Sequence, residues 1–106
     1  MRLDELERLK KYRDEDELLK ISEEIGDKIR FRGYNQEQVL CLANELVRIN
    51  LLSVNCETRE QILYVLCDAA AYYNIRNRVN WDSIMSMKGK LEDDLQKYIE
   101  EFIEKN

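Results

Sequence analysis

The chain has 106 residues, which is enough for one compact domain but too few for two independent hydrophobic cores. Hydrophobic residues make up 44% and charged residues 37% of the sequence. The sequence has three glycines and no proline, so the turns of an all-β fold are disfavoured and an all-α fold is predicted. The net charge of −5 argues against a generally basic nucleic-acid-binding protein but is compatible with a local basic patch.

The N-terminal segment predicts two helices. The first, about residues 3–12, has leucines at positions 3, 6 and 9 but is otherwise mostly charged. Asp14 with Glu17 is typical of a helix N-terminus, so a second helix is expected from near residue 15. Its apolar stripe consists of Leu18, Ile21, Ile25 and Ile29. Because no proline or glycine separates the two segments, one long helix is the alternative.

The segment FRGYNQEQ predicts the end of one helix and the start of the next. Gly33 is expected to adopt the left-handed conformation that closes a helix, with Tyr34 packing back on the last turn. Asn35 with Gln38 predicts a capping box for the following helix.

Two strongly apolar helices are predicted in the middle of the chain, at about 36–52 and 59–74. The second is expected to begin at Thr58 with Gln61. Helices that are apolar on most sides must be buried on several sides, so this pair is predicted to be central, with amphipathic helices packed around it. Short loops favour antiparallel neighbours. Surplus apolar surface on the pair would instead belong to a homodimer interface.

A last helix is predicted to begin at Asn80 with Ser83. Its stripe consists of Leu91, Leu95, Tyr98 and Phe102, and Gly89 indicates a bend or break within it. The predicted fold is therefore all-α: a single-domain antiparallel bundle of about five helices that spans residues 1–106.

The cysteines and the apolar runs favour a cytoplasmic protein. Cys41, Cys56 and Cys67 are odd in number and have no paired spacing, as expected in a reducing compartment. The N-terminus lacks the apolar core of a signal peptide. The longest uncharged apolar run, Ile62–Cys67, is far shorter than the ~20 residues that span a bilayer, so no membrane association is expected.

Catalytic and cofactor signatures are not recognised. The sequence has no histidine, and isolated glycines cannot form a phosphate-binding loop. The pair Glu24-x-x-Asp27 resembles the first of two carboxylate pairs through which all-helical nucleotide pyrophosphohydrolases of the MazG type bind magnesium. The second pair of that family is not matched, because Val65 stands three residues before Asp68. The resemblance implies a magnesium-dependent nucleotide hydrolase as one alternative, whereas the main prediction is a protein without catalytic residues, metal or cofactor.

Candidate binding residues lie in the stretch AAAYYNIRNRVNW, residues 69–81. Tyrosine, tryptophan and arginine are enriched at protein interfaces and also stack on bases of single-stranded nucleic acid. Tyr72, Arg76 and Arg78 are predicted to be exposed contact residues, Tyr73 is assigned to the core, and Trp81 is a candidate for either role. Two basic residues and a tyrosine in the middle of the chain are a second set of candidates: Arg30, Arg32 and Tyr34.

Asp68 lies one helical turn from both Tyr64 and Tyr72, on an otherwise apolar helix. A buried carboxylate there would need an arginine or tyrosine hydroxyl as partner. The alternative is an exposed polar and aromatic stripe that continues into residues 69–81.

These patterns favour a small non-enzymatic protein, such as an adaptor, an inhibitor or an immunity-type protein, that sterically occupies a surface of another protein. A second copy of the chain is an alternative partner. Nucleic-acid contact through the same arginines is the second functional class, although the net charge disfavours it.

Overall fold

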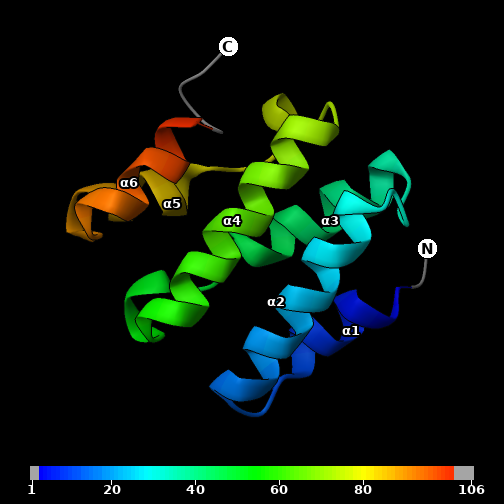
Figure 1. The fold of residues 1–106 in the computed structure, drawn as a ribbon, viewed down its shortest axis with the longest axis horizontal. Helices are drawn as coiled ribbons and strands as arrows, with labels where there is room; N and C mark the ends of the chain where they lie inside the picture. Colours follow the sequence, from blue (N-terminus) through cyan, green and yellow to red (C-terminus); the bar gives the residue numbers. More distant parts are fainter. Residues whose placement is uncertain (1–2, 102–106) are drawn as a thin grey trace.

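The computed structural model describes residues 3–101, which contain helices and connecting segments but no strand (Figure 1). The helices are α1 (Asp4–Lys11), α2 (Glu15–Arg30), α3 (Gln36–Leu46), η1 (Leu51–Ser53), α4 (Cys56–Tyr72), η2 (Arg76–Arg78), α5 (Asp82–Met87), η3 (Lys88–Lys90) and α6 (Asp93–Ile99), where η denotes a 3₁₀ helix. The predicted all-α bundle is confirmed, and the N-terminal segment forms two helices rather than one.

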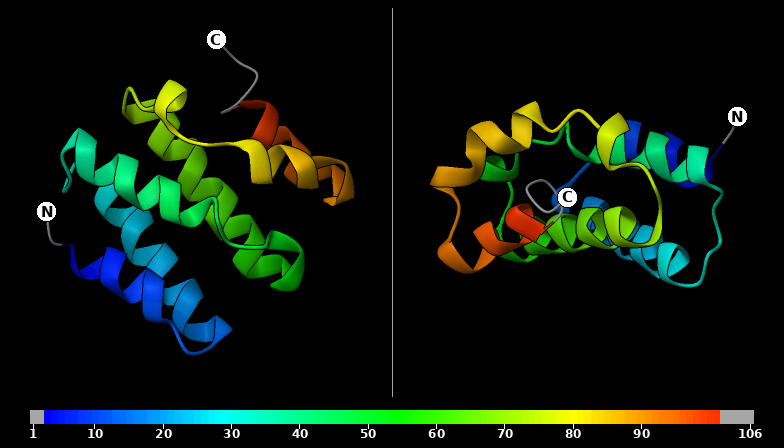
Figure 2. Two further views of the ribbon diagram at one scale, coloured as in Figure 1. Left: turned by 180° about the vertical axis from the view of Figure 1, so that it is seen from behind. Right: turned by 90° about the horizontal axis from the view of Figure 1, so that it is seen from above.

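The helices form two layers (Figure 2). Helices α1, α3 and α5 lie in one layer, and α2, α4 and α6 lie in the other. Consecutive helices form antiparallel hairpins, and the hairpins stack side by side as helix-pair repeats do. The prediction that the third and fourth helices are central is confirmed, since α3 lies between α1 and α5 and α4 lies between α2 and α6.

The most extensive helix contact is between α2 and α4, which are not consecutive and run parallel to each other. Gly26 of α2 faces α4 so closely that a Cβ added there would lie 3.2 Å from Val65 Cγ2 and 3.4 Å from Gln61 Nε2. At the other end of the contact, the backbone N–H of Asn55 donates to Glu15 Oε1 at 2.9 Å. The absence of a side chain at position 26 therefore allows the two backbones to approach.

Helix α1 is joined to α2 largely by charged groups. Arg8 donates two hydrogen bonds to the carboxylate of Glu24, at 3.0 and 2.8 Å. The carboxylate of Glu5 is 4% exposed and accepts hydrogen bonds from the Tyr34 hydroxyl, at 2.6 Å, and from Lys28 Nζ, at 3.2 Å. The predicted leucine face of α1 is also used, with Leu3 and Leu9 buried.

Helix α2 ends in a Schellman motif whose left-handed residue is Arg32, with φ of 59°. The N–H of Arg32 donates to Ile29 O at 3.2 Å, and the N–H of Gly33 donates to Lys28 O at 2.7 Å. The expectation that Gly33 would take the left-handed conformation is therefore wrong by one residue, because Gly33 occupies the position after it.

The predicted starts of the two apolar helices are right in one case and wrong in the other. Asn35 and Gln38 form the expected capping box at α3. Helix α4 begins three residues earlier than expected, because Asn55 is its N-cap and accepts the hydrogen bond of Thr58 N–H. Helix α3 ends at Leu46 rather than near residue 52, and the connection to α4 includes η1.

Arg59 stabilises this connection. Its side chain is 14% exposed and donates to the carbonyls of Leu51, at 2.8 Å, and Val54, at 2.9 Å. Its remaining donors reach the carboxylate of Glu92, just before α6, at 2.6 and 3.0 Å. One arginine therefore joins the residues that precede α4 to the start of α6.

The C-terminal part is broken near Gly89, as the sequence predicted, into α5, η3 and α6. The expected cap is wrong, because Trp81 is the N-cap residue of α5 and the side chain of Asn80 accepts from Asp82 N–H at 3.1 Å. Of the predicted stripe, Leu91 and Leu95 are buried and Tyr98 is partly buried. Phe102 lies outside the described residues.

Candidate protein-binding surface

Two arginines at the C-terminal end of α2 contact tyrosines on α4. The Arg30 guanidinium lies 5.4 Å from the centre of the Tyr64 ring and donates to the Tyr64 hydroxyl at 3.3 Å. The Arg32 guanidinium lies 5.8 Å from the ring centres of both Tyr72 and Tyr73. These are cation–π distances, so the tyrosine rings help to position the two guanidinium groups.

Large apolar side chains are exposed in the same region. Phe31, between the two arginines in the chain, is 82% exposed, while Tyr72 is 45% and Tyr64 is 38% exposed. We call the set Arg30, Phe31, Arg32, Tyr64 and Tyr72 the Arg–Tyr surface. Aromatic and arginine side chains of this kind are the residue types that contribute most to binding energy in protein interfaces.

Asp68 lies beneath this surface, with a side chain that is 20% exposed. Its Oδ2 atom is 3.8 Å from Arg30 Nε, which is within reach of an ion pair but too long for a hydrogen bond. Burial raises the pKa of Asp68, and the positive charge of Arg30 offsets that rise only in part. Both predictions for Asp68 therefore hold in part, since it pairs with an arginine and the tyrosines on either side of it are exposed.

The predicted contact residues do not form one site. Arg30, Arg32 and Tyr72 are brought together, whereas Arg78 donates to the Glu37 carboxylate at 2.6 and 3.1 Å, near the start of α3. That pairing lowers the pKa of Glu37. Arg76 is partly buried and lines a shallow depression with Ala70, Ala71, Tyr73, Asn74 and Asn77.

Three aromatic residues of the prediction have internal contacts. Tyr34 was expected at the surface, but it is 7% exposed because its hydroxyl donates to the buried Glu5 carboxylate. Burial, followed by that hydrogen bond, raises the pKa of Tyr34. Trp81 is partly buried, and its Nε1–H donates to the carbonyl of Arg76 at 2.8 Å. Tyr73 packs against the core as expected and donates to Tyr34 O at 3.1 Å.

The connection from α4 to α5 is less exposed than predicted. Ile75 is 1% exposed and Val79 is 6% exposed, so both belong to the core. The exposed side chains of Asn77 and Arg78 lie between these two apolar anchors in the chain.

Sequence reasoning missed Phe31 as a member of the surface, and it named Tyr64 only in the alternative of an exposed stripe with Asp68 and Tyr72. Phe31 begins the segment FRGYNQEQ, which was interpreted only as the end of one helix and the start of the next. The signal for Tyr64 was its place one turn before Asp68, because Tyr64, Asp68 and Tyr72 follow one helix face.

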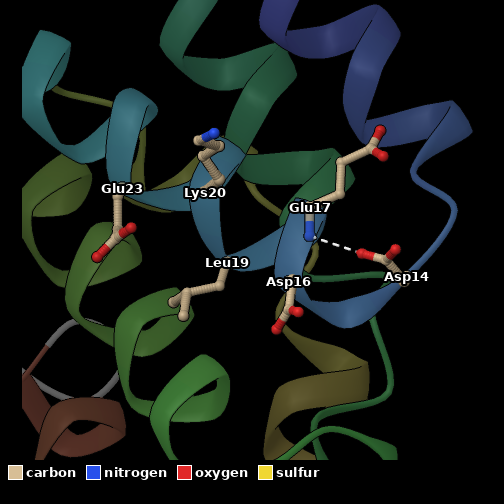
Figure 3. Close-up of a pocket in the computed structure, with 6 residues that line it drawn as sticks. All are labelled: Asp14, Asp16, Glu17, Leu19, Lys20 and Glu23. Atoms are coloured by element: carbon tan, nitrogen blue, oxygen red, sulfur yellow. Dashed lines mark hydrogen bonds between the residues drawn. The ribbon is translucent and has the colours of Figure 1, made fainter.

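A second depression lies along the N-terminal half of α2 (Figure 3). It is lined by Asp14, Asp16, Glu17, Leu19, Lys20 and Glu23. Figure 3 shows the carboxylates pointing in different directions, with Asp14 accepting the N–H of Glu17 at 2.9 Å as a helix cap. Within residues 3–101, no group of three or more histidine, cysteine or carboxylate side chains is arranged to hold a metal ion.

Glu24, which carried the resemblance to the magnesium-binding pair, is engaged by Arg8. The hydrogen bonds from Arg8 lower the pKa of Glu24 and occupy both of its oxygens. A metal ion at Glu24 would therefore compete with the Arg8 guanidinium for the same carboxylate.

Comparison with protein-family models, with curated proteins and with solved structures yields no significant match for this chain. None of the helices within residues 3–101 has the length and apolar character needed to cross a membrane.

Proposed function

We propose that this protein is a small, non-enzymatic protein-binding protein that acts in the cytoplasm by sterically occupying a surface of its partner. The observation that carries the proposal is the 82% exposure of Phe31 between two arginines that lie against exposed tyrosines. The residues used for contact are those of the Arg–Tyr surface.

The packing of the molecule supports a preformed surface. Helices α2 and α4 have the most extensive contact in the protein, and the arginines and tyrosines project from this pair. Rigid aromatic side chains lose little conformational entropy on binding, which favours affinity. The partner would therefore meet a surface that is already ordered.

The proposal is tested by comparing capture from a lysate of the native host by the wild type, Phe31→Ser and Met85→Ser. Met85 is 43% exposed on α5, in the other layer, and serves as the matched control. The expected result is a specific protein bound by the wild type and by Met85→Ser but depleted at least ~10-fold with Phe31→Ser, as for an interface hot spot. Equal capture of every protein by all three would contradict the proposal.

Nucleic-acid contact is a second candidate, favoured by the stacking of Arg30 and Arg32 on tyrosine rings. This candidate requires that a fluorescently labelled single-stranded oligonucleotide binds, and that its affinity falls steeply with added salt. Absent or salt-independent binding would remove it.

A further inference from the structure

Arg32 is held in place at both its backbone and its side chain. Its backbone is the left-handed residue of the Schellman motif, and its guanidinium lies 5.8 Å from the ring centres of Tyr72 and Tyr73. A guanidinium that is already positioned loses less freedom when it binds an anion than a mobile one does.

The donors of Arg32 are not used within the described chain. Across residues 3–101, its contacts are the two tyrosine rings, and no carboxylate lies within 4.0 Å of it. Three other arginines each donate two hydrogen bonds to one glutamate: Arg8 to Glu24, Arg59 to Glu92 and Arg78 to Glu37. Arg32 therefore differs from these three arginines in having no carboxylate partner among the described residues.

We propose that the Arg–Tyr surface binds an extended acidic segment of a partner protein, and that Arg32 receives a carboxylate of that segment. The inference rests on the proposed function and adds the chemistry of the partner. A planar guanidinium recognises a carboxylate through two parallel hydrogen bonds, which gives orientation as well as affinity.

The dimensions of the surface suit a short extended segment. Tyr64 and Tyr72 are two turns apart on α4, roughly 12 Å along the helix axis. About four residues of extended chain cover that length. The shallow depression lined by Tyr73, whose ring Arg32 also contacts, lies next to this surface.

Charge favours a protein segment over a nucleic acid. The whole chain has a net charge of −5, so the long polyphosphate backbone of a nucleic acid would be repelled by most of the molecule. A short acidic segment places its charge only at the arginines, and its apolar residues can contact Phe31 and the tyrosines. The exposed aromatic area then contributes to binding.

The test uses an unbiased library of random displayed peptides, selected on the intact wild-type chain. The binding of the enriched peptides, synthesised with a fluorophore, is then measured by anisotropy to the wild type, Arg32→Gly and Arg13→Gln. Glycine suits the left-handed backbone at position 32, so Arg32→Gly removes the guanidinium without endangering the helix end. Arg13 is 88% exposed, between α1 and α2, and is the matched charge control.

The expected result is an excess of aspartate and glutamate in the enriched peptides. These peptides should bind Arg13→Gln with the same affinity as the wild type, and Arg32→Gly with an affinity lower by ~10-fold or more. The inference is overturned if no peptide is enriched, if the enriched peptides lack an acidic excess, or if Arg32→Gly binds them as well as the wild type. It is also overturned if a single-stranded oligonucleotide binds more tightly than the peptides. A wild type that is a dimer, with an Arg32→Gly variant that is a monomer, would overturn it as well.

Failure of the acidic-segment inference is distinguishable from failure of the proposed protein-binding function. Partner capture that is lost with Phe31→Ser but kept with Arg32→Gly would retain the protein-binding function and refute the acidic segment. Capture unaffected by either substitution would refute both.

Discussion

A single residue, Arg32, shows how local sequence rules can be right in kind and wrong in position. A glycine near the end of a helix predicts a left-handed closing residue, and the closing motif is present. The motif places the left-handed conformation on the residue before the glycine, where a side chain costs about 1 kcal/mol or more. Local sequence does not determine the turn at which α2 stops, because packing against α4 also contributes.

We expect Arg32→Gly to be more stable than Arg32→Ala by about 1 kcal/mol, because glycine adopts the left-handed conformation without a steric penalty. Both variants lose the same contacts with Tyr72 and Tyr73, so their difference isolates the backbone contribution. The free energies of unfolding are measured by urea denaturation. Equal stability of the two variants would show that position 32 is not left-handed in solution.

Glu5 is another residue whose environment the sequence did not reveal. It belongs to a helix that is mostly charged, and periodicity there indicated only the leucine face. Its partners Lys28 and Tyr34 are more than twenty positions away, so only the fold brings them together. A buried carboxylate with such distant partners has no local signature.

The pH dependence of stability should report on Glu5. Burial alone raises the pKa of Glu5, but hydrogen bonds from Tyr34 and Lys28, the positive charge of Lys28 and a backbone hydrogen bond together leave the pKa below its ordinary value of 4.5. A pKa lowered by folding stabilises the protein above the ordinary value, and this stabilisation is lost as pH falls through the folded-state value. We therefore expect Glu5→Gln to show a smaller loss of unfolding free energy between neutral and acidic pH than the wild type.

The Tyr34→Phe variant is the matched test of the cause. It keeps the ring and removes the hydroxyl that donates to Glu5 at 2.6 Å, so it should also flatten the acid limb of the stability profile. An acid limb as steep as that of the wild type in both variants would contradict this assignment.

At the scale of helices, the type was predictable, whereas the number and several boundaries were not: about five helices were predicted, and residues 3–101 contain six α-helices and three 3₁₀ helices. The capping box at Asn35 and the break at Gly89 were predicted correctly. At α4, Asn55 and Thr58 both have side chains that can cap a helix, and local sequence could not decide between them. Asn55 is the cap in the structure, where Glu15 binds its backbone N–H and Arg59 holds the preceding carbonyls. These are tertiary contacts.

The close approach of α2 and α4 at Gly26 leads to a prediction about the packing of these two helices. We expect Gly26→Val to lower the free energy of unfolding by about 1–3 kcal/mol, since even a Cβ would lie 3.2 Å from Val65 Cγ2. Gly89→Ala is the control, because a Cβ added there has nothing within 4 Å. The control should be neutral or stabilising by up to about 1 kcal/mol. Thermal or chemical denaturation gives both values, and a neutral Gly26→Val would mean that the helices can separate locally.

For the whole molecule, composition predicted the all-α class, and the apolar content of two helices predicted which are central. The layered order of the helices was not predictable from short loops alone. Loops place consecutive helices next to each other, but they do not show that α2 would contact α4 more extensively than any other helix. The candidate surface depends on that non-consecutive contact, so its membership could be predicted only in part.

The oligomeric state is a property of the whole molecule. The apolar side chains of α3 and α4 that raised the dimer alternative are buried within one chain, among them Val39, Leu42, Ile62, Leu63 and Leu66. We therefore expect light scattering at micromolar concentration to give the monomer mass of 12.8 kDa. A dimer mass that reverts to the monomer with Phe31→Ser would instead assign the Arg–Tyr surface to self-association.

The attachment of α1 has a consequence for the order in which the native protein opens. Its contacts with α2 include the partly exposed Arg8–Glu24 pair, whereas α2 and α4 have the most extensive helix contact among the described residues, with Ile25, Ile62 and Val65 fully buried. Polar contacts near the surface weaken with salt and contribute less to resisting separation than buried apolar area does. We therefore expect helix α1 to be a separate unit of local unfolding, whose backbone amides exchange with solvent before those of the α2–α4 core.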